Sequence, residues 1–527
     1  MHRPNTAVAG CLALACTATL VAAGASGASP AARRRPKARA SLSSQTLAIG
    51  SQVAPPTLDV TANASSAIDE VVDYNVLQHL VQLAPDGQIV PVLASSYTVN
   101  ANRSVFTFTL RKGVRFSNGD RLTPADVVFS MQRVMAKSST YPNASVFDVK
   151  GVYARGHDQV RVYLQQPSWS WLFDLAAYSN GAVLDPRTVG SLATDPVGTG
   201  PYVVAGTVPD TSVTLKANPT YWGAKPGYAE VDFRYFSDPN AEAAALQSGQ
   251  IQVIDGLPVP SQVASFRSKD YVVETGLTYG KVQLTINNGV APFNDVKVRQ
   301  AIAYAIDKQA VNQVAAAGRG LPLGSDAVPG DPYYLDLASA YPYDPQKAKQ
   351  LLAAAGYPNG FSTTLTLPPY SYATLAGPVI QSELAAVGIK VTIDTVQFPL
   401  WLSQVFEGRN FDLTVIDHNK PRDIGNYGVN YYWNYGGVSA VAKRLAEANA
   451  APTEAGWIRG TRGVLHLVTD EAVNDWLYVV PNISVHRAGV LGLPAFGKAY
   501  SFDLAAARPA SAGAIPASLR KLGYAGR

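Results

Sequence analysis

Residues 105–130 read VFTFTLRKGVRFSNGDRLTPADVVFS, and this stretch contains the signals of a strand, a turn and a helix in succession. Apolar and Thr side chains alternate over residues 105–110, which is the period-two pattern of a strand with one buried face. A helix is predicted to begin at Thr123-Pro124, because Thr can cap a helix and Pro fits its first position. Asp126 complements the positive end of the helix dipole.

The rest of the body alternates strand and helix signals in the same way, without a repeat of fixed period. Strands are predicted at residues 46–49, 389–394 and 411–416. Asp344-Pro345 is expected to open a helix, and Gly356 is expected to end it in the left-handed conformation. We therefore predict an α/β chain with mixed sheets.

The net charge of +5 comes from the N-terminal end of the 527-residue chain. Six basic residues are the only charges among the first 40 positions: Arg3, Arg33, Arg34, Arg35, Lys37 and Arg39. Without them the chain has a net charge of −1. A nucleic-acid-binding protein would carry a basic stripe over its fold, so we expect no nucleic-acid partner. With 47% hydrophobic and 15% charged residues, the body is typical of a globular protein.

The first 28 residues are typical of an export signal. Arg3 supplies the positive end, residues 7–23 are uncharged and largely apolar, and small residues offer cleavage points near Ala25 or Ala28. A transmembrane anchor is the alternative interpretation. No later segment has 18 consecutive uncharged apolar residues, so we expect a soluble mature protein. Residues 29–44 are expected to form a basic linker.

Both cysteines, Cys11 and Cys16, lie inside the predicted signal. A cleaved chain would then contain no thiol, which excludes disulfides, Cys-based zinc sites and cysteine nucleophiles from the body. Either cysteine could instead carry a lipid, so the localisation is expected to be periplasmic or at the cell surface, with a lipoprotein as an open alternative.

Six motifs in chain order resemble those of one protein family. They are PPTLD at residues 55–59, the stretch 110–130, PVGTGPY at 196–202, NPTYWG at 218–223, LQSGQI at 246–251 and VKVRQAIAYAID at 296–307. Together they resemble the family 5 (peptide/nickel type) extracytoplasmic solute-binding proteins of ABC transporters. The resemblance covers nearly the whole mature chain.

The resemblance implies a bilobal periplasmic-binding-protein-like clamshell of type II with an extra inserted domain. Lobe one would comprise residues 45–73, 195–284 and 478–527, with the inserted domain at 74–194. Lobe two would comprise residues 285–477. Two crossing strands would form the hinge, near residues 282–286 and 476–480, and a ligand bound between the lobes would stabilise the closed form.

Catalytic motifs and metal-ligand spacings are missing from the mature sequence. The six histidines, His2, His79, His157, His418, His466 and His486, include no pair at the helical spacing i, i+4. The mature chain contains neither a G-x-S-x-G elbow nor a P-loop. We therefore expect no catalytic residues, no metal and no cofactor, and a binding protein in place of an enzyme.

The candidate ligand-binding residues gather after the strand predicted at 411–416, because loops at strand ends commonly hold binding groups and aromatics supply rigid contact area. The candidates are Phe398, Trp401, Asp417, His418, Arg422, Asp423, Tyr427, Tyr432 and Trp433. The alternative is a polar surface loop whose aromatic residues pack into the core. For Phe398 and Trp401, the alternative is core packing of the short helix around Leu400.

The family resemblance implies that Asp423 pairs with the amino terminus of a peptide ligand, although Ile424 stands where the family has Pro. A di- or oligopeptide is therefore the leading ligand, with an opine, an oligosaccharide or a metal chelate as alternatives. The implied partners are ABC permease subunits with their ATPases, and the protein is expected to be a monomer. A chemosensory receptor of the same fold is the alternative function.

Overall fold

The computed structural model describes residues 46–63, 65–84, 87–136, 147–494, 501–514 and 516–520. The predicted signal and basic linker lie outside the described residues. No helix among the described residues is long and apolar enough to cross a membrane.

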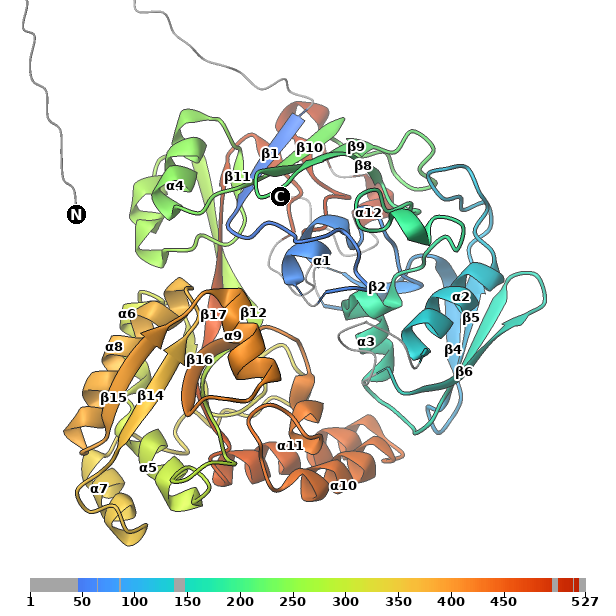
Figure 1. The fold of residues 1–527 in the computed structure, drawn as a ribbon. Helices are drawn as coiled ribbons and strands as arrows, with labels where there is room; N and C mark the ends of the chain where they lie inside the picture. The colour runs from blue at the N-terminus through green and yellow to red at the C-terminus, as the bar shows by residue number, and fades with distance from the viewer. Residues whose placement is uncertain are drawn as a thin grey trace, which may run out of the picture. The chain divides into compact units, whose positions relative to one another are not determined.

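A mixed 11-stranded sheet extends through most of the fold (Figure 1). Its strand order is β15-β14-β16-β12-β17-β11-β1-β10-β9-β8, and β13 pairs with β17. The bounds are β1 Thr46–Ser51, β8 Tyr202–Val208, β9 Ser212–Ala217, β10 Glu230–Tyr235, β11 Val253–Ile254, β12 Tyr271–Ile286, β13 Leu321–Pro322, β14 Ser362–Leu367, β15 Lys390–Thr395, β16 Leu413–His418 and β17 Asn474–Arg487. The prediction of an α/β chain with mixed sheets is confirmed.

Strands β12 and β17 are long because each takes part in both halves of this sheet (Figure 1). The first half of β12 pairs with residues 481–487 of β17, and its second half pairs with β16 and with residues 474–479. The register shifts between Leu277 and Lys281, so residues 278–280 form a bulge where the two halves meet. We propose that this bulge is the hinge between the two lobes whose boundaries are predicted above.

The predicted inserted domain contains its own four-stranded sheet, in the order β4-β5-β7-β6. Its elements are β4 Ala94–Val99, β5 Val105–Leu110, β6 Val149–Arg155, β7 Gln159–Leu164 and the helices α2 Pro124–Met135 and α3 Trp171–Ala177. The strand predicted at 105–110 is confirmed, and its inward-facing Phe106 and Phe108 contact Trp171 of α3. Helix α2 begins at Pro124 as predicted, and Asp126 Oδ2 accepts hydrogen bonds from the backbone N–H and hydroxyl of Thr123, both at 2.8 Å.

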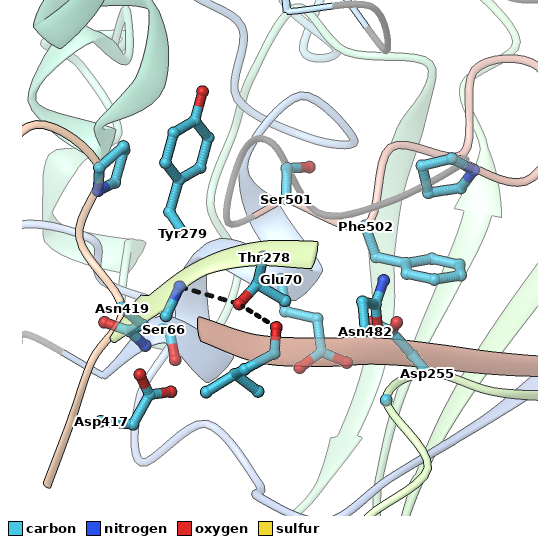
Figure 2. A pocket seen from close by; sticks show the side chains of 15 residues that line it. Ser66, Glu70, Asp255, Thr278, Tyr279, Asp417, Asn419, Asn482, Ser501 and Phe502 are labelled. Carbon is cyan, nitrogen blue, oxygen red and sulfur yellow. Dashed lines mark hydrogen bonds between the residues drawn. The ribbon is translucent and has the colours of Figure 1, made fainter. Parts of the chain in front are cut away.

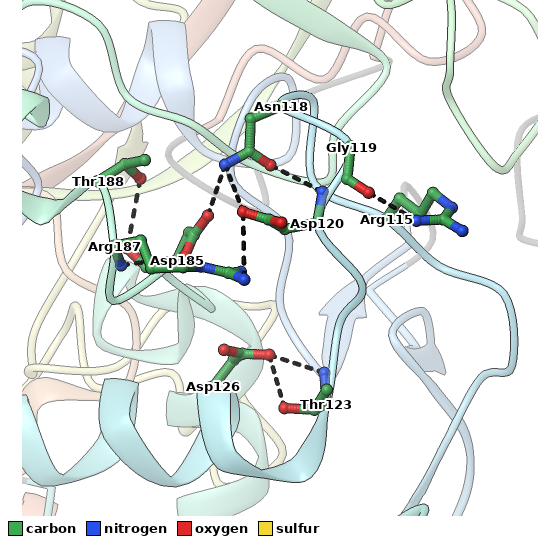
Figure 3. A network of polar contacts seen from close by, with 9 residues as sticks. All are labelled: Arg115, Asn118, Gly119, Asp120, Thr123, Asp126, Asp185, Arg187 and Thr188. Carbon is green, nitrogen blue, oxygen red and sulfur yellow. Dashed lines mark hydrogen bonds and ion pairs between the residues drawn. The ribbon is translucent and has the colours of Figure 1, made fainter.

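A polar network holds the turn that precedes α2 (Figure 3). The amide of Asn118 donates to Asp185 at 2.8 Å and to Asp120 at 3.0 Å. Arg187 completes the network with ion pairs to Asp185 at 2.6 Å and to Asp120 at 3.2 Å. The Asn-Gly-Asp motif therefore connects two segments that are far apart in the chain, which is a structural role.

The remaining helices lie mostly beside the β14–β16 end of the sheet and in a separate pair (Figure 1). Their bounds are α1 Ser66–Val72, α4 Pro239–Ser248, α5 Val296–Ala305, α6 Lys308–Ala315, α7 Pro345–Ala354, α8 Ser371–Ala386, α9 Phe398–Trp401, α10 Val438–Asn449, α11 Glu454–Asp470 and α12 Ala517–Arg520. Helix α7 begins after Asp344 as predicted, and Gly356 follows it with a φ of 90°. Helices α10 and α11 pack against each other.

The strands predicted at 46–49 and 389–394 correspond to β1 and β15 with ends that differ by one or two residues, and the strand predicted at 411–416 is displaced by two residues. Strand β16 begins at Leu413, two positions after the predicted start, and continues through Asp417 and His418. These two polar residues stay in the sheet because they pair with Val282 and Lys281 of β12. They are therefore strand residues, and the connecting segment begins at Asn419.

Candidate functional site

A cavity of about 660 Å³ is lined on one side by the inserted domain and on the other by residues of the predicted lobe two. The inserted domain contributes Trp171, Asp174 and Tyr178, all on or directly after α3. The opposite wall comes from the segment after β16 and from α10 and α11. Aromatic and charged side chains of both signs therefore face the same enclosed space.

Asp423 lines this cavity with a positive partner already in place. Lys281 of β12 points its Nζ at Asp423 Oδ1, 2.6 Å away, and donates to the carbonyl of Lys420 at 2.7 Å. The two side chains are 2% and 7% exposed. Burial lowers the pKa of the Lys281 ammonium, but Asp423 and then Asp326 outweigh burial and raise this pKa above its ordinary value. The pair is therefore a buried, charged ion pair.

Arg422 connects the two walls of the cavity. Its guanidinium carbon lies 3.5 Å from the centroid of the Phe173 ring on α3, a cation–π contact. Next to it, the hydroxyl of Tyr178 donates to the carbonyl of Pro421. Burial raises the pKa of Asp174 on the same helix to about 7, although Arg422 acts to lower it. The segment after β16 is thus held against the inserted domain.

A second contact between the two walls lies next to the cavity at Trp169. Its ring stacks on Trp457 of α11 with centroids 6.3 Å apart, and its Nε1 donates to the carbonyl of Ala451 at 3.1 Å. The guanidinium of Arg103 lies 4.2 Å from the Trp169 ring on the inserted-domain side. These contacts join the two sides in a closed arrangement.

Of the nine predicted ligand-binding residues, Arg422 and Asp423 line the large cavity. A buried layer contains four more: His418, Tyr427, Tyr432 and Trp433. His418 Nε2 and the Tyr432 hydroxyl are hydrogen-bonded at 2.8 Å, and Tyr427 stacks on Trp433 at 4.5 Å. Burial lowers the pKa of His418 to about 4, so its imidazole is neutral. Their contact with a ligand stays a prediction.

Phe398 and Trp401 lie on α9 and are not among the residues that line the cavity. Trp401 is 3% exposed and donates from Nε1 to the hydroxyl of Thr414 at 2.9 Å. Phe398 stacks on Trp401 with centroids 5.8 Å apart. This arrangement corresponds to the core-packing alternative.

Asp417 lines a smaller cavity of about 250 Å³ at the bulge between β12 and β17, named the hinge pocket (Figure 2). Asp417, Asn419 and Pro421 line the hinge pocket, whereas Lys420, Arg422 and Asp423 line the large cavity. The segment 417–423 therefore lies between the two cavities.

The sequence-based candidates did not include the wall supplied by the predicted inserted domain, nor Tyr333, Tyr431 and Trp457 from the predicted lobe two. These residues share no local pattern, because they come from elements brought together only by the fold. The sequence 169–171, Trp-Ser-Trp, is the one local concentration of aromatics that could have indicated this wall. Within the described ranges, no group of three or more His, Cys, Asp or Glu side chains could hold a metal ion.

Comparisons with known proteins identify the fold. A family model described as bacterial extracellular solute-binding proteins, family 5 Middle, matches residues 88–440. The Escherichia coli (strain K12) glutathione-binding protein GsiB is 32% identical over 358 residues, which cover 66% of this chain and 68% of that protein.

Two solved structures extend the similarity over 88% of this chain and 98% of each of theirs. The binding protein AgaA from A. tumefaciens R10, in complex with agropinic acid, has a TM-score of 0.78 and 26% identity. The ABC transporter-associated periplasmic binding protein DppA from Helicobacter pylori, in complex with the peptide STSA, has a TM-score of 0.79 and 23% identity. The predicted type II clamshell and the predicted class of solute-binding receptor are both confirmed. The chain belongs to the bacterial extracellular solute-binding proteins of family 5.

Proposed function

We propose that the large cavity captures a di- or oligopeptide, or a solute of similar size and charge, for delivery to the permease and ATPase subunits of an ABC importer. The observation that carries this proposal is the cavity itself, whose volume of about 660 Å³ lies in the range of roughly 300–1,000 Å³ found for small-molecule sites. Its enclosed position between the two walls suits a ligand that is released when the walls separate.

The lining suits a zwitterionic ligand. Arg422 presents a planar guanidinium that can bind a carboxylate through two hydrogen bonds, and burial lowers the pKa of Lys420 to about 8. Asp174 supplies a carboxyl of opposite charge on the facing wall. Trp171 and Tyr431 add apolar surface for side chains or for a backbone of variable sequence. These features are those expected of a site for short peptides.

Closure is proposed to depend on the two contacts that already join the walls. Ligand binding would favour the closed form because Arg422 on Phe173 and Trp169 on Trp457 form only when the inserted domain approaches lobe two. The permease is expected to recognise this closed form.

An opine is the second candidate ligand, and one observation favours it. The carboxylate of Asp423, which the peptide hypothesis assigns to a ligand amine, is already neutralised by Lys281. A ligand without a free α-ammonium group would therefore leave no charge unpaired at this position. Because the similar protein AgaA was solved in complex with agropinic acid, opines belong in the panel of test ligands.

Native mass spectrometry of the purified protein, followed by calorimetric titration, tests the function. We expect a co-purified small molecule, and micromolar or tighter binding of at least one among glutathione, dipeptides, tetrapeptides and agropinic acid. A protein that carries no small molecule and binds no member of this panel would contradict the proposal.

Export is proposed to begin with cleavage near Ala25 or Ala28, which would leave a mature chain that starts at Ser26 or Ser29. Edman sequencing of secreted protein distinguishes this outcome from an uncleaved chain that begins at Met1. Labelling with palmitate would instead identify a lipid on Cys11 or Cys16.

A further inference from the structure

The hinge pocket is formed where β12 and β17 cross (Figure 2). Thr278 and Gly280 lie in the bulge of β12, and Val480 faces them from β17. The backbone N–H of Gly280 donates to the Thr278 hydroxyl at 2.8 Å, and this hydroxyl donates to the carbonyl of Val480 at 3.1 Å. The pocket therefore lies at the part of the structure that a hinge motion would change first.

Three carboxylates from different elements line this pocket: Glu70, Asp255 and Asp417. Glu70 belongs to α1 and Asp255 follows β11, both in the predicted lobe one, whereas Asp417 is the second-last residue of β16 in the predicted lobe two. Glu70 Oε1 and Asp417 Oδ1 are inaccessible to solvent and have no hydrogen-bond partner. Buried acceptors without a hydrogen-bond donor are unfavourable.

A fourth buried carboxyl group interacts with Asp255 on the predicted lobe-one side. Glu242 of α4 is 1% exposed, and neither of its oxygens has a hydrogen-bond partner. Burial and then Asp255 raise the pKa of Glu242 to about 8, and burial alone raises that of Asp255 to about 7. Burial and Asp255 also raise the pKa of Glu70. The cluster thus behaves as buried acid without a counter-charge.

Lys281 acts to lower the pKa of Asp417, but no cation pairs directly with this cluster in the part of the chain that the structure describes. No ion pair there joins a Lys, Arg or His to Glu70, Glu242, Asp255 or Asp417. Lys281, which pairs in the sheet beside Asp417, directs its ammonium to Asp423. The missing counter-charge must therefore come from a proton or from a bound molecule.

We propose that the hinge pocket is a subsite for an ammonium or guanidinium group, so that the transported ligand carries a positively charged end. This inference rests on the proposed function, because it requires a ligand in the neighbouring large cavity. A ligand lying across the segment 417–423 would place its cationic end among Glu70, Asp255 and Asp417 and its remainder in the large cavity. Ammonium and guanidinium groups supply several N–H donors, which match the unpaired oxygens.

The position of the subsite also connects charge recognition to closure. A cation between Glu70 and Asp417 would contact both predicted lobes, and it would therefore stabilise the arrangement that brings their carboxylates together. A neutral ligand of the same shape would leave these carboxylates unpaired.

Matched dipeptides test the subsite by calorimetry. The probes are Arg-Gly and Gly-Arg, each paired with the analogue in which citrulline replaces Arg, because citrulline retains the shape and removes the charge. We expect one Arg dipeptide to bind the mature wild-type protein about 10- to 100-fold more tightly than its citrulline analogue. In the variants Glu70→Gln and Asp417→Asn this ratio should fall to about twofold or less.

Two controls separate the possible outcomes. Glu447→Gln removes an exposed carboxylate of α10 that lines neither cavity, and it should retain the wild-type ratio. Thermal unfolding verifies that each variant folds. If Asp417→Asn does not fold, the Glu70→Gln variant alone is sufficient for the test. Equal binding of Arg and citrulline dipeptides to wild type, or an unchanged ratio in both variants, would overturn the subsite and leave the proposed function intact. Binding of no peptide at all would overturn both.

Discussion

Replacement of Glu242 by Gln is expected to stabilise the ligand-free protein, because Glu242 is a buried acid without a partner. The residue is 1% exposed, and its pKa rises from an ordinary value of 4.5 to about 8 in the fold. A group whose folded pKa lies above its unfolded pKa stabilises the fold fully only below the unfolded value, and this contribution is lost as the pH rises through the folded pKa. Wild type therefore loses stability between about pH 4.5 and about pH 8.

The size of the effect follows from the cost of keeping the proton on Glu242 in the fold. One pKa unit corresponds to about 1.4 kcal/mol, so near neutral pH the cost is on the order of 3 kcal/mol. Gln has almost the same shape and carries no ionisable proton, so the variant avoids this cost. We expect Glu242→Gln to equal wild type near pH 4.5 and to exceed it by on the order of 3 kcal/mol near pH 7.

Urea unfolding followed by tryptophan fluorescence at several pH values measures this difference, and the chain contains seven Trp residues as reporters. Glu447→Gln removes an equal charge from an exposed helix face and should show no difference that grows with pH. A stability difference between Glu242→Gln and wild type that stays constant from about pH 5 to about pH 8 would refute the buried-acid interpretation.

Three further predictions concern the ion pair, the cavity walls and the pH dependence of binding. Lys281→Met should lose about 3–5 kcal/mol of stability in urea unfolding because it removes the cationic partner of the buried Asp423, and a Lys281→Met/Asp423→Leu double variant should recover most of this loss. Trp169→Ala removes the contacts with Trp457 and Ala451, so ligand affinity should fall about tenfold. Small-angle scattering of the variant with ligand present should show a larger radius of gyration than that of wild type. If neither the affinity nor the radius of gyration changes, Trp169 has no role in closure. Arg-Gly should bind more tightly as the pH rises from about 6 to about 8, because the pKa values of Asp255 and Asp417 are about 7, and calorimetry of Asp417→Asn should give a flatter pH profile.

Local patterns in the sequence correctly predicted those strands and helices whose first residue is determined by its neighbours in the chain. Strand β5 and the start of α2 were predicted correctly because alternation and helix capping act over a few positions. The start of β16 was predicted two residues early, since Phe411 continues the apolar run but packs against Tyr432 with ring centroids 5.7 Å apart. Its end was missed because the pairing with β12 keeps two polar residues in the sheet.

Only one wall of the candidate site was predictable from the sequence, because sequence patterns report on residues that are close together in the chain. The segment after β16 has a distinctive local composition, and two of its predicted members, Arg422 and Asp423, line the large cavity. The partner of Asp423 is Lys281, 142 positions away, and the facing wall comes from α3. No periodicity or motif in a single sequence links residues that meet only in the fold.

We infer that the two cavities have separate roles in orienting the ligand and in recognising its charge, whereas the sequence analysis had assigned the pairing with a ligand amine to Asp423 alone. In the large cavity, Lys281 neutralises Asp423, so this carboxylate can orient a ligand by hydrogen bonding but offers little net charge to attract an amine. In the hinge pocket, three carboxylates have no cationic partner among the described residues. Discrimination by ligand charge should therefore depend on Glu70 and Asp417 more than on Asp423. Because these two residues lie on opposite sides of the proposed hinge, we expect a ligand that pairs with both of them to favour the closed form, which would couple recognition of charge to closure.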